Sequence, residues 1–172
     1  FNLISIDDNY SNKIFNNIKN YNKISFSIYN HKADCFVNDN YIFDNYFSNK
    51  KINIKNVSRD LQGNYNKQNI LISYICCKIL NIQDSIFLES IKKFKGLPFR
   101  SNIIYENKNL KIINNSKSTN LNSTINSIDN YNNIYLIVGG KAKEKNFEIL
   151  SKFKKRIICI YLYGQSSNFI YN

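Results

Sequence analysis

Short segments of alternating apolar and polar residues dominate the first sixty positions of the chain. Alternation with a period of two is typical of half-buried strands, and it predicts five of them, at residues 3–6, 23–29, 34–37, 41–47 and 51–57. Between the first two, residues 11–21 carry apolar side chains three or four positions apart, which predicts a helix with Ser11 as its N-cap. The first part of the chain is therefore predicted to be the edge of a sheet that continues as a meander.

Two longer segments with helical spacing follow. The first, residues 66–80, has an apolar stripe made of Ile70, Leu71, Tyr74, Ile75 and either Ile79 or Leu80. The second, residues 84–95, begins with Asp84 as its cap, and its stripe consists of Ile86, Phe87, Ile91 and Phe94. Gly96 suits the end of a helix, and Pro98, the only proline, prevents the helix from continuing. This point is the best candidate for a domain boundary.

The pattern changes after Arg100. Residues 102–106 and 110–114 flank the turn NKN and predict a hairpin. Continuous apolar runs that end in glycine predict buried parallel strands at 134–140 and 156–164, and helices are predicted at 119–131 and 145–153. This alternation indicates an α/β protein whose second domain is Rossmann-like. Because the chain ends where the next helix is expected, that domain is predicted to be truncated.

Charge and cysteine content narrow the classes of function. The net charge is +12, but only three of the 24 basic residues are arginine and the lysines are scattered. A solvated surface explains this charge better than nucleic-acid binding does, although a basic nucleic-acid-binding module stays open as an alternative. Four cysteines without a CxxC pair and a single histidine do not match a zinc site. Reduced thiols favour a cytoplasmic location.

Neither the first residues nor the apolar runs of the chain indicate a signal peptide or a membrane-spanning segment. No apolar run approaches the roughly 20 residues that cross a bilayer, and the first residues do not resemble a signal peptide. The chain also contains no methionine, even at its start. We therefore expect a segment of a longer protein that does not enter a membrane.

Polar residues gather at two junctions marked by glycine. In GNYNKQN (63–69), Asn66 and Asn69 are three positions apart, so their amides can project from one helical face and match the edge of an adenine; helix capping is the simpler explanation of this segment taken alone. VGGKAK (138–143) lacks the spacing of a phosphate-binding P-loop. Lys141 and Lys143 are nevertheless expected at the carboxyl edge of a parallel sheet, where α/β proteins bind ligands.

A third junction combines GLPFRSN (96–102) with INNSKSTN (113–120). Arg100 follows a rigid turn, and Lys117 and Thr119 follow a strand and are placed to open a helix, whose free N–H groups favour anions. Each segment alone is more simply a surface loop. In this order, however, GxxNxxN, GLPxR, SKxTN and GGxxK resemble the Mur ligase family, and the SKxTN loop resembles that of the members that add D-glutamate. The resemblance covers essentially all 172 residues.

The resemblance implies a fold and a reaction. Residues 1–98 would be the end of a central ATP-binding domain, and residues 99–172 the start of the Rossmann-like acceptor-binding domain. The family uses ATP and Mg²⁺ to form an amide through an acyl phosphate; the substrates implied here are UDP-N-acetylmuramoyl-L-alanine and D-glutamate, for peptidoglycan precursor synthesis. It also implies a cytoplasmic enzyme, monomeric at full length, with no nucleic acid and no membrane among its partners.

The resemblance also assigns residues, at the positions that match the family's motifs. The nucleotide would be bound by Asn66, Asn69, Arg100 and Asn115, and the carboxylates of D-glutamate by Lys117, Thr119 and Lys143. No catalytic residue and no metal ligand is assignable in this segment. The two sets are expected to face one another across a cleft where the domains meet.

Three positions depart from the family pattern. The family usually has His at the positions of Tyr65 and Phe99, and Asp at the position of Asn115; the last change keeps hydrogen bonding but removes a charge that can pair with Arg100. A decayed, non-catalytic relative is therefore an alternative to the ligase. Because the segment lacks a P-loop and assignable magnesium ligands, the isolated chain is predicted to be inactive.

Overall fold

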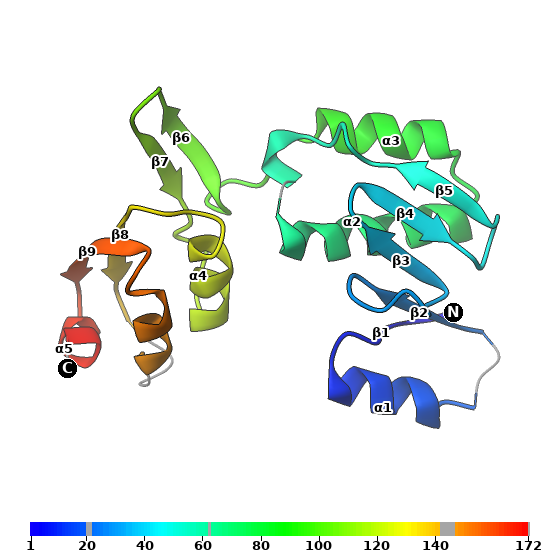
Figure 1. Ribbon diagram of the computed structural model, residues 1–172, viewed down its shortest axis with the longest axis horizontal. Helices are drawn as coiled ribbons and strands as arrows, with labels where there is room; N and C mark the ends of the chain where they lie inside the picture. Colours follow the sequence, from blue (N-terminus) through cyan, green and yellow to red (C-terminus); the bar gives the residue numbers. More distant parts are fainter. Residues whose placement is uncertain (20–21, 62, 142–146, 172) are drawn as a thin grey trace. The chain divides into compact units, whose positions relative to one another are not determined.

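The computed structural model describes residues 1–19, 22–61, 63–141 and 147–171. The chain divides into two compact units, Phe1–Lys95 and Gly96–Asn172 (Figure 1). The assignment of residues 1–98 and 99–172 to an ATP-binding and an acceptor-binding domain remains a prediction.

The first unit is built on a five-stranded sheet in the order β1-β2-β3-β4-β5. Strands β1, β2 and β3 are parallel to one another, and β3, β4 and β5 form an antiparallel meander. All five predicted strands are present; the first and third are shifted by one residue and the other three are shorter than predicted. They are β1 Asn2–Ser5, β2 Lys23–Ser27, β3 Cys35–Asn38, β4 Tyr41–Asp44 and β5 Lys50–Asn53. The α/β prediction is confirmed.

The helices of this unit start where side chains or backbone turns cap them. Helix α1 spans Asn9–Asn17, and its N-cap is Asp8, whose carboxylate accepts from the N–H groups of Tyr10 and Ser11. The prediction of Ser11 as the cap was wrong, because the carboxylate three residues earlier already meets the free N–H groups. A short 3₁₀ turn, η1 (Arg59–Leu61), precedes α2 (Asn64–Ile79), and α3 (Asp84–Lys93) follows, with Gln83 rather than Asp84 at the N-cap.

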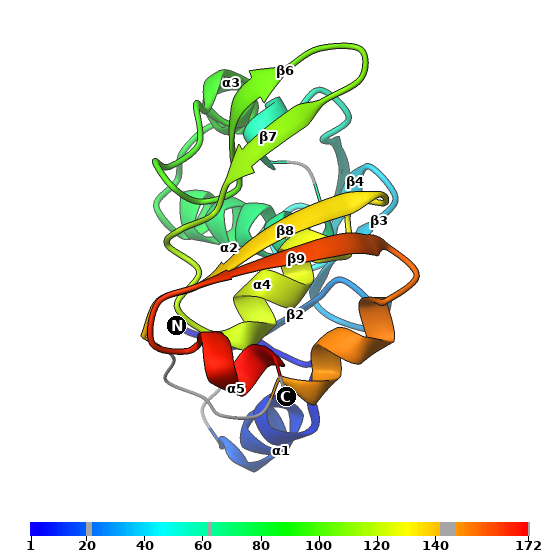
Figure 2. The ribbon, with the colours of Figure 1, turned by 90° about the vertical axis from the view of Figure 1, so that its left-hand side faces the viewer.

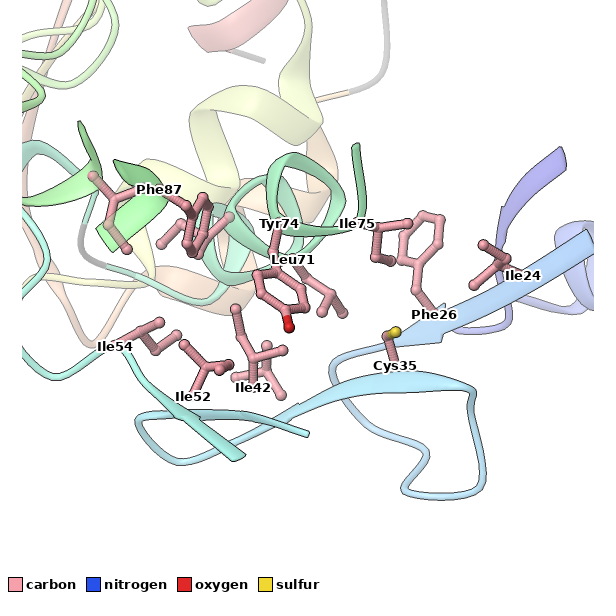
Figure 3. Close-up of a cluster of buried hydrophobic side chains, with 13 residues drawn as sticks. Ile24, Phe26, Cys35, Ile42, Ile52, Ile54, Leu71, Tyr74, Ile75 and Phe87 are labelled. Carbon is pink, nitrogen blue, oxygen red and sulfur yellow. The ribbon is translucent and has the colours of Figure 1, made fainter. Parts of the chain in front are cut away.

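The core of the first unit lies between α2 and the sheet. The predicted stripe Ile70, Leu71, Tyr74 and Ile75 is buried against residues of β2 to β5 (Figure 3). Ile79 also packs there, whereas Leu80 is exposed. On α3 only Phe87 and Ile91 are buried, so the prediction for Ile86 and Phe94 was wrong; a ten-residue helix resting on α2 needs only a narrow stripe.

The cysteines differ from the prediction in one respect. All four are free thiols, and Cys35 is buried in the core. Cys76 and Cys77 lie in an apolar run of the sequence, where buried thiols are common, but Cys76 is exposed and Cys77 only partly buried, because neither belongs to the stripe of α2 that faces the sheet.

A buried carboxylate joins the sheet to α2. Asp44, at the end of β4, is fully buried and accepts hydrogen bonds from the hydroxyl groups of Tyr74 (2.9 Å) and Ser48 (2.6 Å) and from the N–H of Phe47 (2.8 Å). Burial by itself raises the pKa of Asp44, but these bonds outweigh it, and the pKa is lowered overall. Burial raises the pKa of Tyr74, and the hydrogen bond to the Asp44 carboxylate raises it further. This link fixes the middle of α2 on the sheet.

The second unit contains two separate pairs of strands. The predicted hairpin is present as antiparallel β6 (Asn102–Glu106) and β7 (Lys111–Asn114). The two later strands are parallel neighbours, as predicted, at β8 (Ile134–Gly139) and β9 (Ile157–Tyr163) (Figure 2). The helical elements are α4 (Leu121–Ile128), the 3₁₀ helix η2 (Glu148–Phe153) and α5 (Ser167–Tyr171).

The prediction that β8 and β9 are buried on both faces was wrong. The register aligns Ile137 with Tyr161, and these two side chains are 73% and 54% exposed; Tyr135, on the same face, is 61% exposed. Among the described residues, nothing covers this face fully. The predicted helix 145–153 is a 3₁₀ helix over its described part. Within the described part of the chain, no helix is long and apolar enough to span a membrane.

Candidate functional site

The start of α2 brings two of the predicted site residues together. Gly63 occupies the N-cap with a φ of +102°, a conformation that glycine adopts without steric cost. Asn66 is buried and donates from Nδ2 to the carbonyl of Asp60 (3.3 Å), while exposed Asn69 donates to Oδ1 of Asn66 (3.4 Å). The two amides therefore share a face, as predicted. The simpler explanation, that a side chain of this segment caps the helix, was wrong: the N-cap residue is Gly63, which has no side chain that could accept a hydrogen bond.

A third residue of this segment, Gln68, was missed by the sequence analysis. Its Nε2 donates to Oγ of Ser5, the last residue of β1 (3.1 Å), and to Oδ2 of Asp7, just past that strand (3.3 Å). Asp7 also accepts from the N–H of Ile28 (3.2 Å), just past β2. These bonds tie the start of α2 to the carboxyl ends of two parallel strands. Gln68 is 63 positions from Ser5 and 61 positions from Asp7 in the sequence. No local sequence pattern connects residues so far apart, so these contacts could not be predicted.

The turn after Gly96 presents Arg100. The N–H of Arg100 donates to the carbonyl of Leu97 (3.2 Å), which closes the turn, and the residue is exposed. Its two neighbours have left-handed backbones, with φ values of +64° at Phe99 and +50° at Ser101. Residues other than glycine rarely adopt this backbone conformation.

The loop that follows β7 is hydrogen-bonded to this turn. The N–H of Lys117 donates to the carbonyl of Phe99 (3.1 Å), and the N–H of Ser101 donates to Oδ1 of Asn115 (3.1 Å). The two segments that the sequence analysis combined, GLPFRSN and INNSKSTN, are therefore in direct contact within the second unit. Lys117 and exposed Thr119 follow in the same loop.

The loop leads into α4 in the way its sequence predicts. Asn120 is the N-cap and accepts from the N–H of Ser123 (2.8 Å). Ser118 Oγ lies 3.0 Å from Thr124 Oγ1, which holds the loop against the first turn of the helix. Lys117 and Thr119 thus stand before a helix N-terminus, with both side chains exposed.

The glycine pair at the end of β8 allows a close backbone contact. A Cβ at Gly139 would lie 1.9 Å from the carbonyl oxygen of Tyr163, and the N–H of Gly140 donates to that same oxygen (2.9 Å). Gly164 has a φ of +73° and packs against Gly140. These glycines therefore allow the backbones at the ends of β8 and β9 to approach one another closely. Lys141 follows directly and is exposed, whereas Lys143 lies outside the described residues.

The arrangement can bind polar ligands, but it lacks a metal centre within the described residues. Asn66 and Asn69 offer amides in the first unit; Arg100, Asn115, Lys117 and Thr119 gather in the second. Among the residues that the structure describes, no three His, Cys, Asp or Glu side chains form a group that could hold a metal ion.

Comparison with known proteins gives matches over the whole chain, although no family model matches it. The chain is 33% identical over 178 residues to UDP-N-acetylmuramoylalanine–D-glutamate ligase of Rickettsia bellii, covering 100% of this chain and 39% of that protein. It is 31% identical over 205 residues to the ligase of the same name from Buchnera aphidicola, covering 99% of this chain and 46% of that protein. The chain thus spans less than half the length of these relatives.

A solved structure has the same fold. MurF from Acinetobacter baumannii aligns with 98% of this chain and 39% of its own, with a TM-score of 0.69 and 14% sequence identity. At this identity the likeness concerns the fold alone. Sequence and fold comparisons thus agree with the resemblance seen in the four motifs.

Proposed function

By its sequence and its fold this chain belongs to the Mur ligase family, and from that premise we propose that it is part of an ATP-dependent ligase. The reaction would add D-glutamate to UDP-N-acetylmuramoyl-L-alanine during peptidoglycan precursor synthesis, in the cytoplasm and in a monomeric full-length protein. The observation that supports this proposal most strongly is the direct contact between two segments: the turn around LPFR (97–100), called the LPFR turn, and the loop around SKST (116–119), called the SKST loop. Both segments carry family motifs, and the contact brings their polar residues to one place.

The two units suit two roles. Residues 1–98 would be the end of the ATP-binding domain and residues 99–172 the start of the acceptor-binding domain. The division of the chain at Lys95–Gly96 supports this proposal, since it lies three residues from the proposed boundary.

We propose nucleotide-binding residues in each unit taken separately: the amides of α2 in the first and the turn that carries Arg100 in the second. An amide offers both a donor and an acceptor, which the edge of adenine requires, and Asn69 is exposed beside Asn66. Arg100 carries a fixed positive charge suited to ribose or phosphate oxygens. Asn115 would lie near the nucleotide, next to that arginine.

D-Glutamate would be held by cations and a hydroxyl group. Its two carboxylates require positive donors, which Lys117 and Lys143 can supply, with Thr119 as a further hydrogen-bond donor. The exposure of Lys117 and Thr119 before the N-terminus of α4 supports this role.

The chemistry would proceed in two steps. The substrate carboxylate attacks the γ-phosphorus of ATP and gives an acyl phosphate and ADP; the amine of D-glutamate then attacks the acyl carbon. The tetrahedral intermediate expels phosphate, and the nitrogen loses a proton to leave the amide. Magnesium would offset phosphate charge in the first step, and we expect it to be held mainly by residues of the longer enzyme that this chain does not include. This chain's contribution is to bind and orient the nucleotide and the amine.

The proposal is tested with the longer protein that contains this chain. We expect phosphate release that requires ATP, UDP-N-acetylmuramoyl-L-alanine and D-glutamate together. Lys117→Ala should raise KM for D-glutamate at least tenfold, because one carboxylate loses its cation. Lys108→Ala, an exposed lysine in the hairpin turn of the same unit, serves as the matched control and should leave that KM unchanged.

A non-catalytic relative is the second candidate, favoured by the departures at Tyr65, Phe99 and Asn115. It predicts that the longer protein binds ATP but releases no phosphate with all substrates present. The isolated chain should be inactive under either candidate.

A further inference from the structure

Two strained residues flank Arg100. In the described part of the chain, six residues other than glycine have positive φ: Asp39, Asn49, Asn81, Phe99, Ser101 and Asn133. Four of them are Asp or Asn, whose short polar side chains tolerate the left-handed conformation. Phe99 and Ser101 are the two exceptions, and they stand immediately before and after Arg100. Such a conformation persists only where neighbouring structure enforces it.

The neighbouring structure that enforces this turn is the loop after β7. It makes one hydrogen bond with each strained residue. The N–H of Lys117 donates to the carbonyl of Phe99, and Oδ1 of Asn115 accepts from the N–H of Ser101, both at 3.1 Å. The bonds lie on either side of Arg100. The backbone of Arg100 is thus held at both ends by a loop that is 15 or more residues further along the chain.

We propose that Asn115 and the backbone of Lys117 form a clamp that positions Arg100, so that Asn115 acts as a positioning residue. This inference rests on the proposed function, because it deepens the roles of Arg100 and Lys117. A long side chain such as that of arginine reaches a defined oxygen only when its backbone is fixed. The clamp supplies that fixation.

The clamp has a consequence for the two ligands. Lys117 carries a proposed D-glutamate contact on its side chain and one clamp bond on its backbone. A ligand that orders Lys117 therefore also orders the turn that presents Arg100 to the nucleotide. Coupling of this kind is reciprocal, so each ligand should strengthen the binding of the other.

The clamp itself is tested on this chain, without any enzyme assay. Amide hydrogen exchange measured by NMR reports the Ser101 N–H directly. Loss of one net hydrogen bond corresponds to roughly fivefold to tenfold faster exchange, which we expect at Ser101 in Asn115→Ala. Asn115→Asp keeps an acceptor and should retain the protection. The matched control is Asn107→Ala, which removes an Asn acceptor for Asn109 and Leu110 in the hairpin turn and should leave Ser101 unaffected.

A second pair of variants separates positioning of Arg100 from direct contact of Asn115 with the nucleotide. Ser101→Val leaves Asn115 intact but places a β-branched residue at a φ of +50°, whereas glycine adopts that φ freely. In the longer protein, Ser101→Val should raise KM for both ATP and D-glutamate by about tenfold and by more than Ser101→Gly does.

The outcomes distinguish the clamp from the proposed function. Unchanged exchange at Ser101 in Asn115→Ala would overturn the clamp, whatever the activity of the longer protein. Equal KM values in Ser101→Val and Ser101→Gly would overturn its role in positioning Arg100. Absence of ATP-dependent activity in the wild-type protein would overturn the proposed function and leave the exchange result to decide the clamp.

Discussion

The link between Asp44 and Tyr74 allows a quantitative test of how α2 is held on the sheet. Tyr74→Phe removes only the hydroxyl group, since the ring keeps its place in the core and its edge contact with Phe87, at 5.4 Å between centroids. The lost bond is 2.9 Å long and ends on a fully buried carboxylate. This variant therefore isolates one charge-assisted hydrogen bond.

The expected magnitude follows from the surroundings of Asp44. Hydrogen bonds to charged groups contribute about 1.5–3 kcal/mol. Asp44 keeps its bonds from Ser48 and Phe47 in the variant, so it is not left without donors. We therefore expect a loss of about 2 kcal/mol in the free energy of unfolding of the first unit. With a urea dependence of about 1–2 kcal/mol per molar, the midpoint should fall by about 1–2 M.

The stabilisation that Asp44 provides depends on pH. The pKa of Asp44 is lowered in the folded state, so its stabilisation is present above the ordinary carboxylate pKa and is lost as the pH falls through the lowered value. Tyr74→Phe removes a bond that favours the charged form and should flatten this dependence. The assay is urea unfolding followed by NMR signals of the first unit at pH 7 and pH 3. An unchanged midpoint at pH 7 would refute the reasoning.

Three further predictions concern the segments around the site. Gly139→Ala should destabilise the second unit by about 3 kcal/mol or more in thermal unfolding, because its Cβ would lie 1.9 Å from a backbone oxygen of β9, whereas Gly140→Ala, with open space around the Cβ, should cost less; equal losses would contradict this. Gln68→Leu should speed amide exchange at residues 64–69 and raise KM for ATP but not for D-glutamate in the longer protein; a change in both KM values would count against it. Phe99→His should stabilise the second unit by roughly 0.5 kcal/mol, because His tolerates a φ of +64° better than Phe, and a lower melting temperature would disprove this.

Hydrophobic periodicity was sufficient to predict most elements, because it records which side of each element is buried. The stripe on α2 is an example: Ile70, Leu71, Tyr74 and Ile75 are spaced for one helical face, and all four are buried. The same logic failed for β8 and β9, where apolar residues on both faces predicted burial. Tyr135 and Ile137 are exposed instead, since apolar sequence specifies a preference for burial and not the partner that provides it.

The contacts of the site were less predictable than its segments. Motif order indicated that the LPFR turn and the SKST loop belong together, but no pattern indicates which atoms meet. The bond from Ser101 to Asn115 and the bonds from Gln68 to the end of β1 depend on the path of the backbone between distant residues. Backbone φ values are equally invisible: nothing in the letters of Phe99 and Ser101 predicts a left-handed conformation.

Two of the three departures that the resemblance to the family implies fall on the clamp. An Asp at the position of Asn115 would accept the Ser101 N–H with a charged oxygen, and such bonds are roughly twice as strong as neutral ones. A His at the position of Phe99 would adopt the left-handed backbone more readily. Both departures therefore weaken the same turn while leaving each clamp bond geometrically possible. Both substitutions act on one local structure, the turn that positions Arg100. Weakening this one turn is a smaller change than the loss of two independent ligand contacts.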